Sequence, residues 1–84
     1  MKIEHYVVGM VGTNCYFAIN EHTKECVIID PGDEAAKLSE KLTAGGYKPV
    51  AILLTHAHFD HIMGVDALAG KYNIPVYIHE NDAD

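Results

Sequence analysis

Features that mark several protein classes are scarce or missing in this 84-residue sequence. It has two cysteines and no tryptophan, whereas a secreted disulfide-bonded domain of this size usually has more cysteines. Six basic residues stand against twelve acidic ones and form no basic run, so electrostatic binding to nucleic acid is not expected. No apolar run approaches the roughly 20 residues that span a membrane, and no signal-peptide cleavage pattern follows the first residues. These absences predict a soluble, cytoplasmic protein without a membrane or nucleic-acid partner.

The two cysteines, Cys15 and Cys26, each lie in an apolar, strand-like run. Neither has a Cys-x-x-Cys partner of the kind that structural zinc sites use. We therefore predict that both are buried thiols in the hydrophobic core and not metal ligands.

The first part of the sequence predicts strands. Strand-like runs at 2–8, 14–19 and 25–29 are separated by turn residues, a pattern typical of an antiparallel meander. A helix is expected next, because Asp33 can cap its start and Gly45-Gly46 can stop it.

The second part alternates strands with a helix. Residues 49–54 (Pro-Val-Ala-Ile-Leu-Leu) are continuously apolar, as is typical of a strand buried on both faces. Apolar residues then recur at helical spacing at Ile62, Val65, Leu68 and Tyr72. A short strand at 74–78 completes the order β-β-β-α-β-α-β. This order predicts an α/β fold with a mixed sheet and flanking helices.

A polar segment rich in metal ligands follows the apolar run directly: Thr55-His56-Ala57-His58-Phe59-Asp60-His61. Residues two apart in an extended chain project to the same side, so His56, His58 and Asp60 can converge on one locus. His61 lies where the chain turns into a helix and can face a neighbouring locus. Zinc would satisfy these nitrogen and oxygen ligands, and iron or manganese would also accept them. The alternative is a histidine-rich surface loop in which Asp60 caps the following helix.

This segment resembles the Thr-His-x-His-x-Asp-His signature of the metallo-β-lactamase-fold hydrolases. The matching positions are Thr55, His56, His58, Asp60 and His61. Asp30-Pro31-Gly32 is similar to the Asp-Pro-Gly turn of that family, and the resemblance covers essentially the whole chain. Among subfamilies, the start Gly12-Thr13-Asn14-Cys15-Tyr16 looks most like the glyoxalase II-type thioesterases.

The resemblance implies a dinuclear metal centre, with two zinc ions in a complete site and iron or manganese as other metals. His56 and His58 would bind one metal, and Asp60 and His61 the second, together with ligands from later motifs of the family. Asp60 is also the candidate catalytic residue. Asp30 would orient the ligand loop through a hydrogen bond. Its other interpretation is a plain turn aspartate, since Asp-Pro-Gly is good turn chemistry.

The implied function is hydrolysis of a small-molecule thioester or related ester by a metal-bound hydroxide. The family fold is an αββα sandwich built from two halves. Residues 1–84 are therefore expected to form one partial domain, the N-terminal half, with the C-terminal half absent. The sheet face left exposed would favour self-association, and a symmetric homodimer could bring two ligand loops together.

Two other functions stay open at this point. The chain could be a non-catalytic metal-binding or self-associating module. It could also resemble the iron-dependent persulfide dioxygenases, which use a similar loop. The sequence does not identify the substrate, because the half that is absent shapes much of the pocket in this fold.

Overall fold

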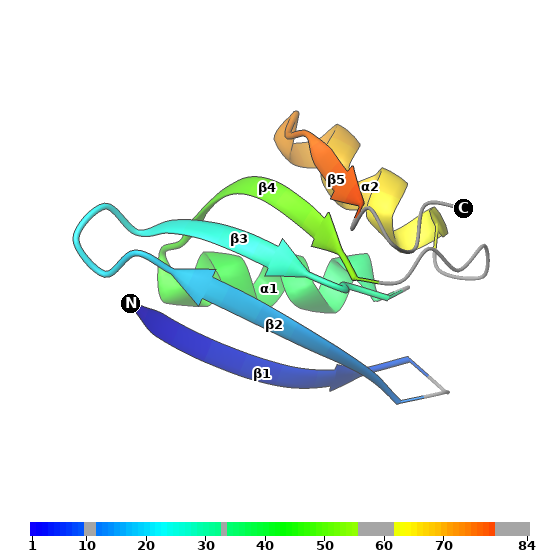
Figure 1. The fold of residues 1–84 in the computed structure, drawn as a ribbon, viewed down its shortest axis with the longest axis horizontal. Coiled ribbons are helices and arrows are strands. Elements are labelled where there is room, and N and C mark those ends of the chain that lie inside the picture. The colour runs from blue at the N-terminus through cyan, green and yellow to red at the C-terminus, as the bar shows by residue number, and fades with distance from the viewer. Residues whose placement is uncertain (10–11, 33, 56–61, 79–84) are drawn as a thin grey trace.

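The structure is a computed structural model that describes residues 1–9, 12–32, 34–55 and 62–78. In this part of the chain, five strands form one sheet in the order β1-β2-β3-β4-β5 (Figure 1). The elements are β1 (Lys2–Val8), β2 (Thr13–Ile19), β3 (Glu25–Ile29), α1 (Ala35–Gly45), β4 (Lys48–Leu54), α2 (Ile62–Tyr72) and β5 (Val76–Ile78). The predicted order β-β-β-α-β-α-β and the α/β class are confirmed.

Strand directions in the sheet define two edges. β1, β2 and β3 form the predicted antiparallel meander, whereas β3 pairs with β4, and β4 with β5, in parallel. Parallel neighbours need a crossover connection, and α1 and α2 supply the two crossovers. As a result β1, β3, β4 and β5 all end on the same side, toward the right of Figure 1. We call this side the carboxyl edge and the opposite side the amino edge.

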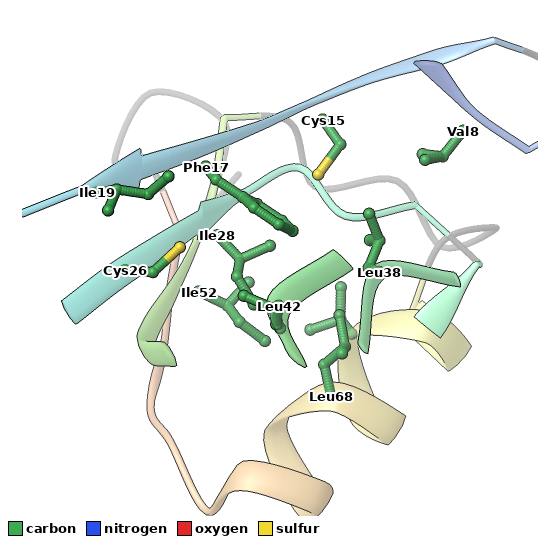
Figure 2. Packing of buried hydrophobic residues seen from close by; sticks show 11 residues of the cluster. Val8, Cys15, Phe17, Ile19, Cys26, Ile28, Leu38, Leu42, Ile52 and Leu68 are labelled. Carbon is green, nitrogen blue, oxygen red and sulfur yellow. The ribbon is translucent and has the colours of Figure 1, made fainter. Parts of the chain in front are cut away.

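Both helices cover one face of the sheet. Leu38 and Leu42 of α1 and Leu68 of α2 are at most 1% exposed. Figure 2 shows them between the helices and the strands. They pack in one cluster with strand side chains that include Phe17 and Ile28. Full burial of such a side chain contributes about 1.5–3 kcal/mol, so this single cluster holds the helices to the sheet.

The other face of the sheet carries no helix in the part of the chain that the structure describes. Its exposed apolar side chains include Ile3, Val7, Tyr16 and Tyr77, the last 59% exposed. We call this the open sheet face. On it the ring of His5 stacks on Tyr16, with 4.7 Å between ring centroids.

One prediction about burial is wrong. The apolar run that forms β4 was expected to be buried on both faces, but Ile52 is its one buried residue, and Ala51 and Leu53, which alternate with it, are only partly buried. The physical reason is that both helices lie on the same face. An apolar strand is buried on its second face only when another layer covers that face.

The end of α1 agrees with the sequence. Gly46 has a left-handed backbone with φ of 68°, and its N–H donates to the carbonyl of Thr43. Glycine adopts this conformation without a steric cost, which is why helices often end there. The N-cap position is taken by Glu34, while Asp33, which we expected to cap the helix, lies outside the described residues. Neither described helix has the length and apolar character needed to cross a membrane.

A polar network joins β1 to the start of β4 at the amino edge. The hydroxyl groups of Tyr47 and Tyr6 both donate to the carboxylate of Glu4. The ammonium group of Lys2 lies 3.2 Å from the same carboxylate. The hydrogen bonds from Tyr47 and Tyr6 hold the pKa of the Glu4 carboxyl below its ordinary value. Because Glu4 and Tyr47 are 43 residues apart, this network links two distant parts of the chain.

Candidate functional site

The predicted metal ligands follow β4 in the sequence. β4 ends at Leu54, and Thr55 is the last described residue before the gap. His56, His58, Asp60 and His61 lie outside the described residues, so their arrangement as metal ligands stays a prediction. Within the described ranges, no group of three or more His, Cys, Asp or Glu side chains is placed to hold a metal.

Asp30 is the one predicted site residue that the structure describes. It follows β3, and its carboxylate reaches the residue that follows β4. One oxygen, Oδ1, accepts a hydrogen bond from the backbone N–H of Thr55 at 2.8 Å. The other, Oδ2, accepts a hydrogen bond from the Thr55 hydroxyl. Asp30 therefore holds both the backbone and the side chain of the residue that immediately precedes His56.

The backbone of Asp30 makes a further hydrogen bond. Its N–H donates to the carbonyl of Leu53 at 3.0 Å, so the residue is bonded to both ends of the segment 53–55. Its φ is 52°, in the left-handed region, which costs most residues about 1–2 kcal/mol but which Asp tolerates better than most. Hydrogen bonds to an ionised carboxylate are among the stronger ones in proteins. They offset the cost of this backbone conformation.

This geometry agrees with the interpretation of Asp30 as a residue that orients the ligand loop. It does not test whether Asp30 affects metal binding. A plain turn aspartate would bond to the backbone of its own turn. The carboxylate of Asp30 instead reaches across 25 residues to Thr55. The geometry suits a residue that fixes where the ligand loop starts, and that role stays a prediction.

Sequence reasoning missed two residues at this edge. Thr55 was recognised as part of the signature, but nothing in the sequence identified its hydroxyl as the partner of Asp30. The carboxylate of Glu34 accepts a hydrogen bond from the N–H of Gly9 at 2.7 Å. No local signal could have revealed this contact, because the two residues are 25 positions apart.

The cysteines are buried, as predicted. Cys15 and Cys26 are free thiols with 0% exposure. Burial raises the pKa of each thiol to about 12. Both are therefore protonated near neutral pH, whereas a metal ligand or a nucleophile needs the thiolate. Their role is packing in the core.

The residues that follow Thr55 in the sequence have side chains that suit a metal ion. Three imidazoles and one carboxylate follow Thr55 within six residues, a set that suits zinc and is accepted by iron. Both oxygens of Asp30 already accept hydrogen bonds from Thr55. This favours a supporting role for Asp30 over direct ligation, and leaves His56, His58, Asp60 and His61 as the candidate ligands.

Comparison with known proteins agrees with this chemistry. Probable metallo-hydrolase YqgX of Bacillus subtilis (strain 168) is 45% identical over 82 residues, which cover 98% of this chain and 38% of that protein. Hydroxyacylglutathione hydrolase of Enterobacter sp. (strain 638) is 43% identical over 65 residues, covering 76% of this chain and 26% of that protein. The chain thus spans well under half the length of these relatives.

Solved structures have the same fold. BLEG-1 B3 metallo-beta-lactamase matches with a TM-score of 0.85 and 45% identity, over 95% of this chain and 38% of that one. TTHA1623 in a di-iron-bound form matches with a TM-score of 0.79 and 40% identity, over 94% of this chain and 39% of that one. The family model of the metallo-beta-lactamase superfamily matches residues 8–84. The chain belongs to the metallo-beta-lactamase superfamily.

Proposed function

We propose that this chain supplies the first metal-ligand motif of a metal-dependent hydrolase that acts on thioesters or related esters. His56, His58, Asp60 and His61 would hold the metal, which we propose to be zinc, two ions in a complete site. The double hydrogen bond from Thr55 to Asp30 carries the proposal. It fixes the chain immediately before the ligand residues, in a member of the metallo-beta-lactamase superfamily that is similar to a probable metallo-hydrolase.

The side chains of this protein have two tasks in that function. The four ligands bind the metal, and Asp30 fixes the backbone from which they project. When bound, such a metal lowers the pKa of water and stabilises negative charge that develops on a carbonyl oxygen. Preorganisation matters because small displacements of catalytic groups reduce rates strongly. A carboxylate that holds the preceding residue by two bonds limits such displacements.

Similarity to a hydroxyacylglutathione hydrolase supports a thioester substrate, since that relative is 43% identical over 65 residues. Zinc is supported by the imidazole-rich ligand set. The similar structure of TTHA1623 was obtained in a di-iron-bound form, which favours iron as the alternative metal. The activity of the whole protein is part of this proposal, because the chain covers 38% of the length of YqgX.

Zinc binding is the first test. Calorimetric titration of the purified chain with zinc, and separately with ferrous iron, gives the affinity for each metal. We expect tighter binding of zinc, and a loss of at least roughly tenfold in His56→Ala, because even residues that only support metal ligands contribute 10–100-fold. His22→Ala is the matched control, since this exposed histidine lies in the hairpin between β2 and β3. Equal zinc affinity in all three proteins would refute the proposed site.

Turnover is the second test. Zinc-loaded chain is incubated with a hydroxyacylglutathione thioester, and the release of free thiol is measured. Hydrolysis that is lost in His56→Ala and retained in His22→Ala would support the enzymatic function. Zinc binding without hydrolysis would show that residues 1–84 bind metal but do not complete a catalytic site by themselves.

A further inference from the structure

The first strand, β1, is the outermost strand of the sheet on one side. Among the described residues it pairs with β2 and with no strand beyond it (Figure 1). We call its unpaired long side the β1 edge. Such an edge presents a row of backbone N–H and C=O groups that can pair with another chain, unless proline or a β-bulge interrupts it. β1 contains no proline and pairs with β2 in an unbroken register of seven residues.

Hydrogen bonds of β2 show in which direction its backbone groups point. The N–H of Asn20, just after β2, donates to the carbonyl of Glu25 at 2.8 Å. Directly bonded pairs recur at every second residue of an antiparallel ladder. The backbone of Tyr16, which is paired with Ile29, therefore also faces β3. The backbone of the next residue, Phe17, faces β1.

The same alternation identifies the unpaired backbone groups of β1. Phe17 pairs with Glu4, so the N–H and C=O of Glu4 face β2. The backbone groups of Ile3, His5 and Val7, which alternate with those that face β2, point away from the sheet. These three residues supply the free donors and acceptors of the β1 edge.

Side chains leave these groups accessible. Ile3 and Val7 are 57% and 58% exposed. The ring of His5 is held over β2, because it stacks on Tyr16 and its Nε2 lies 2.9 Å from Oδ1 of Asn14. It therefore points away from the β1 edge.

The charged residues of β1 are engaged elsewhere. Charged side chains, lysine above all, often protect an edge strand from pairing. The ammonium group of Lys2 lies 3.2 Å from the Glu4 carboxylate. That carboxylate also accepts a hydrogen bond from the hydroxyl of Tyr47. Both charges thus belong to the network that joins β1 to the start of β4.

The free groups of the β1 edge are complementary to those of a second copy of this chain. If two copies of β1 align antiparallel with His5 opposite His5, then Ile3 of each copy lies opposite Val7 of the other. Every one of these pairs joins residues whose N–H and C=O both point outward, so each pair can form two hydrogen bonds. A shift of two residues in either direction loses one of the three pairs within β1.

We propose that β1 pairs in this register with β1 of a second copy, which makes a symmetric dimer with one continuous sheet. The contact uses the backbone of the β1 edge and is separate from association through the open sheet face. It does not depend on the proposed metal binding.

His5→Pro and His5→Ala test the role of the backbone. Both variants remove the imidazole, but only proline removes the N–H that would bond to the second copy. That N–H faces away from β2, so proline is compatible with this position of an edge strand. Sedimentation velocity with EDTA, which prevents metal from bridging two copies, should show dimerisation about 10–100-fold weaker in His5→Pro, because two hydrogen bonds per dimer are lost. His5→Ala should dimerise nearly as well as the wild type.

Cysteine cross-linking tests the register. His5→Cys should form a disulfide-linked dimer on oxidation with copper phenanthroline, because a directly bonded antiparallel pair has Cα atoms about 5.5 Å apart, within disulfide range. Ile3→Cys alone should not, since its two copies would lie about 13 Å apart along the strand. A mixture of Ile3→Cys and Val7→Cys should cross-link. The native Cys15 and Cys26 are 0% exposed and should not react.

Tyr77→Lys separates this dimer from association through the open sheet face. Tyr77 is exposed on that face in β5, at the opposite end of the strand order from β1. We expect this variant to keep the β1 dimer. Loss of the dimer in Tyr77→Lys but not in His5→Pro would overturn the proposal, and so would a wild type that is monomeric at all concentrations. If His5→Pro does not fold, cross-linking decides: no disulfide in His5→Cys, or as much in Ile3→Cys alone, would overturn it.

Discussion

Asp30→Ala should destabilise the chain and weaken its metal site together. The substitution removes the acceptor for the Thr55 N–H and the acceptor for the Thr55 hydroxyl. Hydrogen bonds to charged groups contribute about 1.5–3 kcal/mol each, and Asp30 is half-buried, so the lower value applies. Alanine at a φ of 52° adds about 1 kcal/mol of backbone strain. We expect the free energy of unfolding to fall by about 3–4 kcal/mol.

Asp30→Asn separates the hydrogen bonds from the charge. Asparagine tolerates the left-handed conformation, and its side-chain oxygen can accept from the Thr55 N–H while its amide donates to the hydroxyl. The expected loss is therefore about 1 kcal/mol. Urea unfolding followed by circular dichroism measures both variants. A double-mutant cycle of Asp30→Ala with Thr55→Val should give a coupling energy of about 1 kcal/mol, because the hydroxyl interacts directly with the carboxylate.

The same substitutions should also change zinc affinity. If Asp30 positions the ligand loop, Asp30→Ala should weaken zinc binding by about 10–100-fold, as is usual when a residue that orients metal ligands is removed. Asp30→Asn should retain most of the affinity. Two results would refute the reasoning: Asp30→Ala within about 0.5 kcal/mol of the wild type in stability, or Asp30→Ala with unchanged zinc affinity.

Three further predictions concern stability and association. Glu4, whose carboxyl pKa lies below the ordinary 4.5, should stabilise the fold above that pH, and this stability should be lost as the pH falls through the folded-state pKa. Urea titrations should show a weaker pH dependence in Glu4→Gln, and an unchanged dependence would contradict the network. Gly32→Ala should lower the free energy of unfolding by about 2–4 kcal/mol, because the new Cβ is strained at a positive φ and overlaps Val8. Gly46→Ala, where a Cβ meets nothing within 4 Å, should lower it by about 1 kcal/mol. Equal losses in the two variants would refute the close packing at Gly32. The chain should self-associate through the open sheet face, and sedimentation velocity should detect this. The double variant Ile3→Lys, Val7→Lys should associate less. A monomer at all concentrations would exclude the proposed homodimer.

The order of elements could be predicted because it depends on local patterns. Strand-like runs separated by turn residues identified the three strands of the meander, and Gly45-Gly46 identified the end of α1, where Gly46 has a left-handed backbone. These signals arise within a few residues of the feature that they specify. The burial of β4 could not be predicted in the same way. Its residues are apolar throughout, but whether a second layer covers them depends on other parts of the structure.

Contacts between residues that are far apart in the sequence could not be predicted either. Asp30 was identified as a candidate because it belongs to a turn that resembles a family motif. A hydrogen bond between Asp30 and the ligand loop was predicted, but Thr55 was not identified as its partner. The bond from Tyr47 to Glu4 spans 43 residues, and that from Gly9 to Glu34 spans 25. A carboxylate beside a helix start predicts a cap, since capping is the common local use of such a residue. Only the folded arrangement shows that Glu34 bonds elsewhere.

The polar networks around Glu4 and around Asp30 lie at opposite edges of the sheet, which makes their effects separable. Tyr47 directly precedes β4 and Thr55 directly follows it, so about 26 Å of extended strand separates them at about 3.3 Å per residue. Substitutions that far apart and without shared partners usually have additive effects. Glu4→Gln should therefore lower stability without changing zinc affinity, whereas Asp30→Ala should change both. Comparing the two variants distinguishes a specific effect on the ligand loop from a general loss of stability.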